Sequence, residues 1–183
     1  MRWLLFLLLI LLIPKRNVVT VVPDRSPGDG VEFAASGLDE LSIVVDIANV
    51  MGARPDGWWR DPAGAALRLC REIAGLAARG LTGSDLPADI PEPARIHWVL
   101  VLEGRARKAA ASWPGEPAAG SSANSQHLAR IVLAPGSGDD TIAAQARDLQ
   151  GYRLVVTADR ELRRRCEQAG AMIAGPRWLL ALL

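Results

Sequence analysis

Acidic side chains follow four short apolar runs of the sequence, each near the point where the run ends. Asp46 follows LSIVV, Glu103 follows HWVLVL and Asp159 follows LVVTA, whereas Asp139 and Asp140 follow IVLAPGSG, which includes a short turn. If these runs are parallel strands, the acids meet at the carboxyl edge of one sheet, where ligand crevices form. Carboxylates gathered there repel one another unless a cation lies between them. The pattern predicts a site for a divalent cation that prefers oxygen ligands, Mg²⁺ or Mn²⁺.

Most of these acids also have a simpler structural interpretation. Asp139, Asp140 and Asp159 stand where a helix N-cap is expected, and a cap contributes about 1 kcal/mol by itself. Glu103 precedes an arginine-rich stretch that could hold it in an ion pair. Capping does not explain Asp46, which we expect to end a buried strand before an irregular loop. Taken together, the acids favour a metal site, with Glu103 as its weakest, additional member.

The elements that must position these acids are short strands alternating with helices. Continuous apolar runs bounded by turn residues are typical of strands buried on both faces of a parallel sheet. Asp61 and Pro62 provide the N-cap and first-turn proline of a helix that Gly80 ends. We expect strands at 43–45, 98–102, 131–133, 154–156 and near 171–174, and further helices from about 140, over 160–168 and over 178–183.

This alternation implies βαβ crossovers. It therefore predicts an α/β fold, a three-layer α/β/α Rossmann-like sandwich with a mainly parallel sheet. Residues 104–127 interrupt the pattern and are expected to form a flexible surface loop.

Composition excludes several classes of protein. Half of the 183 residues are hydrophobic, and 21 Lys and Arg stand against 20 Asp and Glu, which gives a net charge of +1. A chain so close to neutral does not bind nucleic acid by bulk charge alone, although a local basic surface is still allowed. The two cysteines and two histidines lack metal-ligand spacing. A metal would therefore need oxygen ligands.

The chain divides into an N-terminal segment, residues 1–37, and a folded domain, residues 38–183. The apolar run from Trp3 to Ile13 is shorter than the ~20 residues that a membrane-spanning helix needs. It could be a signal peptide or anchor within residues 1–16, or the product of a start site assigned too far upstream, and a linker follows it. We expect no stable membrane span and a cytoplasmic location, with the signal or anchor left open.

Three motifs resemble those of NYN domains, which belong to the PIN-like nuclease superfamily. They are DIANV at 46–50, GDD at 138–140 and TADREL at 157–162, in the order in which the family has them, within a resemblance that spans about 41–178. Ile47 departs from the small residue that often follows the first acid. The resemblance implies a PIN-like fold, metal-dependent RNA cleavage, metal ligation by Asp46, Asp139, Asp140 and Asp159, and an orienting role for Asn49.

The function that this set of residues predicts is a divalent-metal-dependent ribonuclease. Water activated by the metal would attack the RNA phosphodiester, so no protein nucleophile is needed, in agreement with the absence of a credible catalytic triad. RNA is the expected partner, and a homodimer is left open. Tryptophan and arginine side chains near the acids could stack bases and hold phosphates, although the tryptophans could equally cover the core. These candidate RNA-binding residues are Arg54, Trp58, Trp59, Arg60 and Arg160.

Two other functions remain open at this stage. One is a catalytically inactive RNA-binding or scaffold module of the same fold. The other is a phosphate-ester hydrolase, although Ile47, Ala48 and Asn49 follow Asp46 where the common aspartyl-phosphate enzymes have DxDxT.

Overall fold

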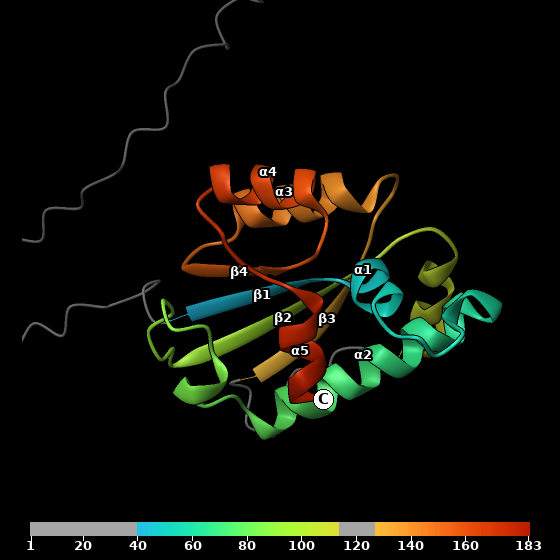
Figure 1. Cartoon of the computed structure of the whole chain (residues 1–183), viewed down its shortest axis with the longest axis horizontal. Helices are drawn as coiled ribbons and strands as arrows, with labels where there is room; N and C mark the ends of the chain where they lie inside the picture. Colours follow the sequence, from blue (N-terminus) through green and yellow to red (C-terminus); the bar gives the residue numbers. More distant parts are fainter. Residues whose placement is uncertain (1–39, 114–126) are drawn as a thin grey trace, which may run out of the picture. The chain divides into compact units, whose positions relative to one another are not determined.

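The computed structural model describes residues 40–113 and 127–183, which form a five-stranded parallel sheet with helices on both faces (Figure 1). The predicted three-layer α/β fold is confirmed, and every expected strand is present. The strands lie in the spatial order β3-β2-β1-β4-β5. Their bounds are β1 (Glu40–Asp46), β2 (Arg95–Leu102), β3 (His127–Leu133), β4 (Tyr152–Val156) and β5 (Met172–Ala174).

Helices cover the sheet in two groups. In the view of Figure 1, α3 (Gly138–Asp148) and α4 (Arg160–Gln168) lie above the sheet. On the opposite face are α1 (Ile47–Gly52), α2 (Pro62–Arg79) and α5 (Pro176–Leu182). Three short 3₁₀ helices connect these elements: η1 (Trp58–Arg60), η2 (Gly83–Asp85) and η3 (Gly104–Ser112).

The strands are buried on both faces, as their continuous apolar runs predict. Along β1, Ile43 and Val45 point into the core beneath α2, whereas Val44 between them points into the core beneath α3 and α4. Hydrophobic burial on both sides therefore fixes the sheet in the middle layer. Only the strand ends remain available for polar chemistry.

The order of the strands creates a crevice at one place on the carboxyl edge. The chain proceeds outward from β1 to β2 and β3, and then returns to β4 on the other side of β1. The helices that follow β1 and β4 consequently lie on opposite faces, which leaves the ends of these two strands uncovered. Val45 pairs with Val156, so the next residues, Asp46 and Thr157, leave the sheet side by side.

Two segments differ from the sequence-based expectation. Residues 47–52 form α1 rather than an irregular loop, because Asp46 provides an N-cap immediately after the strand. Residues 104–112 form η3 rather than a loop, and its Ala106 and Ala109 are buried in the core. Of the interruption expected at 104–127, residues 114–126 fall outside the described part of the chain, as do residues 1–37.

No helix within 40–113 or 127–183 is long and apolar enough to cross a membrane.

The start of α2 gives a test of this local structure. Asp61 caps the helix by accepting a hydrogen bond from the Gly64 nitrogen at 2.9 Å, and a Cβ added to Gly64 would lie 1.9 Å from the other Asp61 carboxylate oxygen. Gly64→Ala should therefore displace the cap. Gly75→Ala in the same helix meets only the end of Arg79 and should gain helix propensity. We expect Gly64→Ala to be about 1 kcal/mol less stable than Gly75→Ala in urea denaturation. Equal stabilisation by both substitutions would contradict this account of the cap.

Candidate active site

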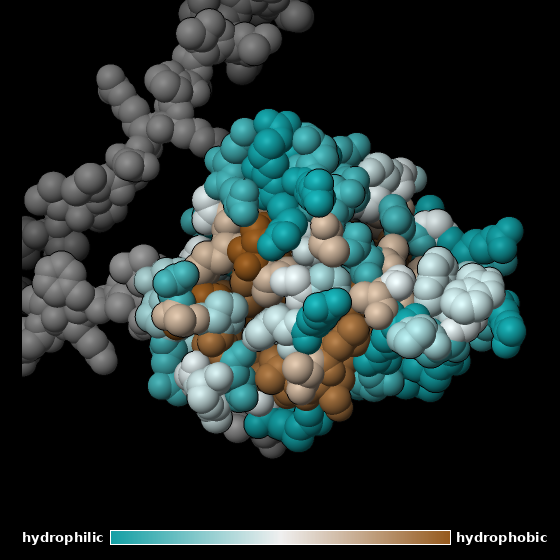
Figure 2. Space-filling model, viewed as in Figure 1, coloured by the Kyte–Doolittle hydropathy of each residue, from teal (hydrophilic) through white to brown (hydrophobic). Residues whose placement is uncertain are grey.

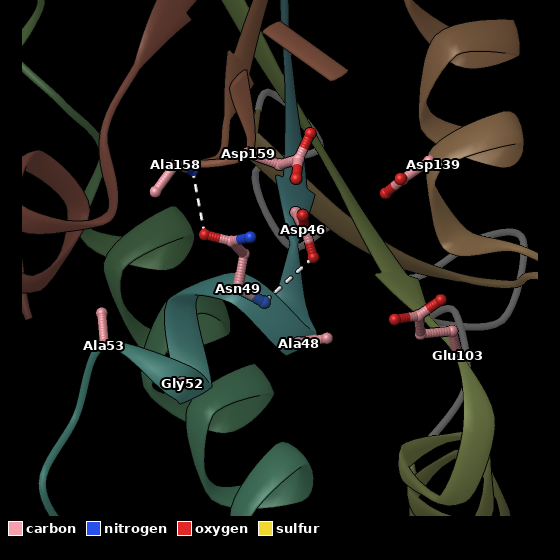
Figure 3. A pocket seen from close by; sticks show the side chains of 9 residues that line it. All are labelled: Asp46, Ala48, Asn49, Gly52, Ala53, Glu103, Asp139, Ala158 and Asp159. Carbon is pink, nitrogen blue, oxygen red and sulfur yellow. Dashed lines mark hydrogen bonds between the residues drawn. The ribbon is translucent and has the colours of Figure 1, made fainter. Parts of the chain in front are cut away.

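An open hollow of about 470 Å³ lies at the carboxyl edge of the sheet, where β1 and β4 end (Figure 3). Four of its lining side chains are acids that come from different elements, and none is basic. The lining residues are Asp46, Ala48, Asn49, Gly52, Ala53, Glu103, Asp139, Ala158 and Asp159.

Asp46 is the most buried of these acids, with 6% of its surface exposed. Its Oδ1 accepts a hydrogen bond from the Asn49 nitrogen at 3.0 Å, and its Oδ2 accepts one from the Thr157 hydroxyl at 2.9 Å. The expectation that capping does not explain Asp46 is therefore wrong, because Asp46 caps α1. Its carboxylate nevertheless lines the hollow, so the cap and the site share one side chain.

Burial raises the pKa of Asp46 from 3.8 to about 6. The two hydrogen bonds oppose this rise because they stabilise the charged form, whereas the neighbouring charges of Asp139 and Glu103 add to it. A carboxylate in this position destabilises the fold at neutral pH. A charged Asp46 therefore needs a compensating interaction, such as a bound cation, or a function that offsets its cost.

Thr157 connects two of the acids, a role that the sequence alone did not indicate. Its side chain is fully buried, donates to Asp46, and accepts a hydrogen bond from the Asp159 nitrogen at 3.2 Å. Its position could have been inferred only from the pairing of β1 with β4, which sets it beside Asp46.

Asn49 and Asp159 complete the connection between the two strand ends. The Asn49 side-chain oxygen accepts a hydrogen bond from the Ala158 nitrogen at 2.9 Å, so Asn49 joins α1 to the loop after β4. Asp159 caps α4 by accepting from the Leu162 nitrogen at 2.8 Å, and it lines the hollow as well. The orienting role expected for Asn49 stays a prediction, but its contacts are those that such a role requires.

Glu103 holds the start of α3. Its Oε2 accepts a hydrogen bond from the Gly138 nitrogen at 2.8 Å, and a Cβ at Gly138 would lie 2.6 Å from that oxygen, so only glycine allows this approach. A negative charge at a helix N-terminus is stabilised by the helix dipole. The arginine-rich stretch that follows Glu103 forms no ion pair with it among the described residues.

Asp139 and Asp140 point to different surroundings, because consecutive side chains on a helix are turned by about 100°. Asp139 lines the hollow, and its pKa is raised by burial and by the charges of Asp159 and Glu103. Asp140 is 73% exposed, does not line the hollow, and accepts a hydrogen bond from Arg165 at 2.8 Å. The structure thus brings together Asp46, Asp139, Asp159 and Glu103 but leaves Asp140 outside.

The chemistry of this hollow suits a hard cation, although its geometry does not form a closed cage. Within the residues that the structure describes, no three Asp, Glu, His or Cys side chains converge closely enough to hold a metal ion by themselves. The two cysteines are buried in the two opposite cores and cannot contribute. Mg²⁺ is commonly held by one or two carboxylates together with waters and substrate phosphate. An open hollow lined by carboxylates fits this mode of binding.

The candidate RNA-binding residues differ in availability. Arg54 forms an ion pair with Glu72, and Trp58 packs against the core. Trp59 is 58% exposed, and its ring lies nearly perpendicular to that of Trp58, at 82° and 6.2 Å between centroids. Arg60 is exposed.

Arg160, the remaining candidate, is an exposed residue at the start of α4. Figure 2 shows a strongly hydrophilic surface over α3 and α4.

No family model matches the chain, and a search of curated proteins found no match. A search of solved structures found similarity to a mutant of Rae1 (YacP) from Bacillus subtilis, with 18% sequence identity, a TM-score of 0.48, and coverage of 76% of this chain and 72% of that chain. This is a distant structural relation. The resemblance to NYN domains stays a prediction.

The raised pKa of Asp46 makes stability depend on pH. The folded state binds the Asp46 proton more tightly than the unfolded state does, so protonation of Asp46 stabilises the fold. This stabilisation is fully present below about pH 4 and is lost as the pH rises through about 6. Asp46→Asn cannot titrate. Without metal, we expect the stability of the natural protein relative to Asp46→Asn to fall by on the order of 2–3 kcal/mol between about pH 4 and pH 8, measured by urea denaturation. A difference that does not change with pH would contradict this assignment.

Thr157 should stabilise the fold through its hydroxyl rather than its shape. Thr157→Val keeps the volume but leaves an Asp46 oxygen and the Asp159 nitrogen without their partner. We expect a loss of about 1–3 kcal/mol in the free energy of unfolding, and a much smaller loss for Thr157→Ser, which retains the hydroxyl. Equal losses for both variants would mean that packing, not hydrogen bonding, makes Thr157 important.

Proposed function

We propose that the chain is a divalent-metal-dependent ribonuclease whose active site is the carboxylate-lined hollow. The observation that carries this proposal is the set of four acids, Asp46, Glu103, Asp139 and Asp159, around one open hollow without a basic side chain in its lining. Both Asp46 and Asp139 have raised pKa values to which neighbouring acids contribute. Like charges held together at this cost are typical of functional sites that receive a cation.

In the proposed site, Asp46, Asp139 and Asp159 would hold Mg²⁺ or Mn²⁺, which when bound supplies a water of lowered pKa and polarises a phosphate oxygen. Thr157 and Asn49 keep Asp46 and Asp159 in place, and Glu103 keeps Asp139 in place through the start of α3. The uncompensated carboxylates repel a phosphodiester. RNA is therefore expected to enter the hollow only together with the cation.

Two alternatives make different use of the same residues. An inactive RNA-binding or scaffold module has no need to keep four acids around one hollow, where neighbouring acids add to the raised pKa values of Asp46 and Asp139. A phosphate-ester hydrolase of the aspartyl-phosphate type needs a carboxylate oxygen that can attack phosphorus. Asp46 is largely buried and accepts a hydrogen bond at each oxygen, which disfavours that use.

Asp139 and Asp140 provide a matched pair for testing the proposal. Both are acids in the first turn of α3, but only Asp139 lines the hollow. We expect Asp139→Asn to reduce RNA cleavage in Mg²⁺ by on the order of 100-fold or more, and Asp140→Asn to retain it within about threefold. The measurement is the cleavage rate of end-labelled single-stranded RNA, with single-stranded DNA and a generic phosphate monoester assayed in parallel.

Metal binding is tested separately by thermal unfolding. Mn²⁺ should raise the melting temperature of the natural protein and of Asp140→Asn more than that of Asp139→Asn, because only the last variant loses a proposed ligand. Mn²⁺ stabilisation without cleavage would favour the inactive module. Hydrolysis of the monoester alone would favour the phosphate-ester hydrolase, and identical behaviour of the two variants would exclude the hollow as the site.

A further inference from the structure

The loop that follows α1 exposes a large aromatic side chain a few residues along the chain from the lining of the hollow. Trp59 is 58% exposed, and it and Leu133 are the two exposed large hydrophobic residues in the part of the chain that the structure describes. Ala53 lines the hollow, and Trp59 follows it by six residues, so the two lie at most ~20 Å apart. An exposed tryptophan at this distance from a candidate active site is a candidate contact for substrate.

The backbone holds this tryptophan in a defined position. The Asp56 carboxylate accepts a hydrogen bond from the Trp58 nitrogen at 3.1 Å, and Gly57 adopts φ +77°, a conformation that glycine allows readily. The Arg60 nitrogen donates to the Gly57 carbonyl at 3.0 Å, which closes the turn around the two tryptophans. Trp58 packs against the core. The loop therefore presents Trp59 with little loss of conformational freedom on binding.

Exposed cationic side chains lie on η1 and on η3. Arg60 is exposed next to Trp59, and η3, which follows the carboxyl end of β2, exposes Arg105, Arg107 and Lys108. Both η1 and η3 pack against α2. None of these four side chains forms an ion pair within the described ranges. An exposed aromatic face together with unpaired cationic side chains is the combination that binds single-stranded nucleic acid.

We propose that Trp59 is a base-stacking platform that guides single-stranded RNA toward the hollow, with Arg60 and the η3 cations holding its phosphates. This inference rests on the proposed ribonuclease function for the identity of the substrate. A stacked base must present a free π-face, so the platform selects unpaired RNA over duplex RNA. At the stacked rise of ~3.4 Å per nucleotide, the separation of at most ~20 Å from Ala53 corresponds to no more than about six nucleotides.

Binding to a labelled oligouridine RNA of about ten nucleotides tests the platform. The full chain carries Asp46→Asn so that cleavage does not interfere, and Mg²⁺ is present. We expect Trp59→Ala to raise the Kd about 10-fold and Trp59→Phe to change it by less than about twofold, because phenylalanine still stacks. RNA should quench indole fluorescence, and Trp59→Phe should remove most of that quenching while binding persists.

Charge is tested against a control arginine at the opposite edge of the sheet, Arg95, which pairs with Glu40. Arg60→Ala should lower the slope of log Kd against log salt by about one, whereas Arg95→Ala, at the start of β2, should leave it unchanged. An unchanged Kd for Trp59→Ala, equal binding of duplex RNA, or equal effects of the two arginine variants would overturn the platform.

Failure of the platform and failure of the proposed function can be distinguished. Retained cleavage in Asp139→Asn would reject the active site, whatever the binding results for Trp59. Loss of cleavage in Asp139→Asn together with unchanged binding in Trp59→Ala would reject only the platform. Trp59→Phe keeps the test valid should Trp59→Ala fail to fold, since the quenching signal then decides.

Discussion

The arrangement of the site depends on one buried carboxylate at the end of a parallel strand. Asp46 cannot reach bulk water freely, so its charge must be stabilised by the protein or matched by a cation. Two hydrogen bonds, from the Asn49 backbone and from Thr157, supply part of that stabilisation, yet the pKa of Asp46 still rises to about 6. The remaining deficit at neutral pH is the physical reason to expect a cation in the hollow.

Helix N-termini explain how several acids can share one edge of the sheet. Asp46 caps α1, Asp159 caps α4, and Glu103 accepts from the first residue of α3. The partial positive charge at these helix starts offsets some of the repulsion between the carboxylates. Capping and ligand binding are therefore not competing explanations for these acids. The caps fix carboxylates that a cation can then use, and Asp139, which makes no such cap, is the member whose role depends most on the site.

The sequence predicted the architecture because hydrophobic burial leaves a direct record in the chain. Continuous apolar runs and the proline and glycine at the ends of α2 identified the layers and the edge at which the acids meet. Contacts between individual residues that lie far apart in the chain leave no comparable pattern in the sequence. The sequence did not distinguish Asp139 from Asp140, since that depends on the rotation of α3 against the sheet, and it did not reveal that Glu103 contacts Gly138 from 35 positions away. It also missed α1, because the six residues of that helix are too few for a helical period to be visible.

The segregation of charge follows from the same constraint. The chain is almost neutral overall, but every charged side chain that lines its hollow is acidic, while arginines lie outside it on η1, η3 and α4. A polyanion attracted to those arginines still meets repulsion at the strand ends. In the proposed ribonuclease, this separates affinity from reactivity: the arginines and Trp59 hold the strand nearby, and its phosphodiester can enter the hollow only when a divalent cation has neutralised the acids.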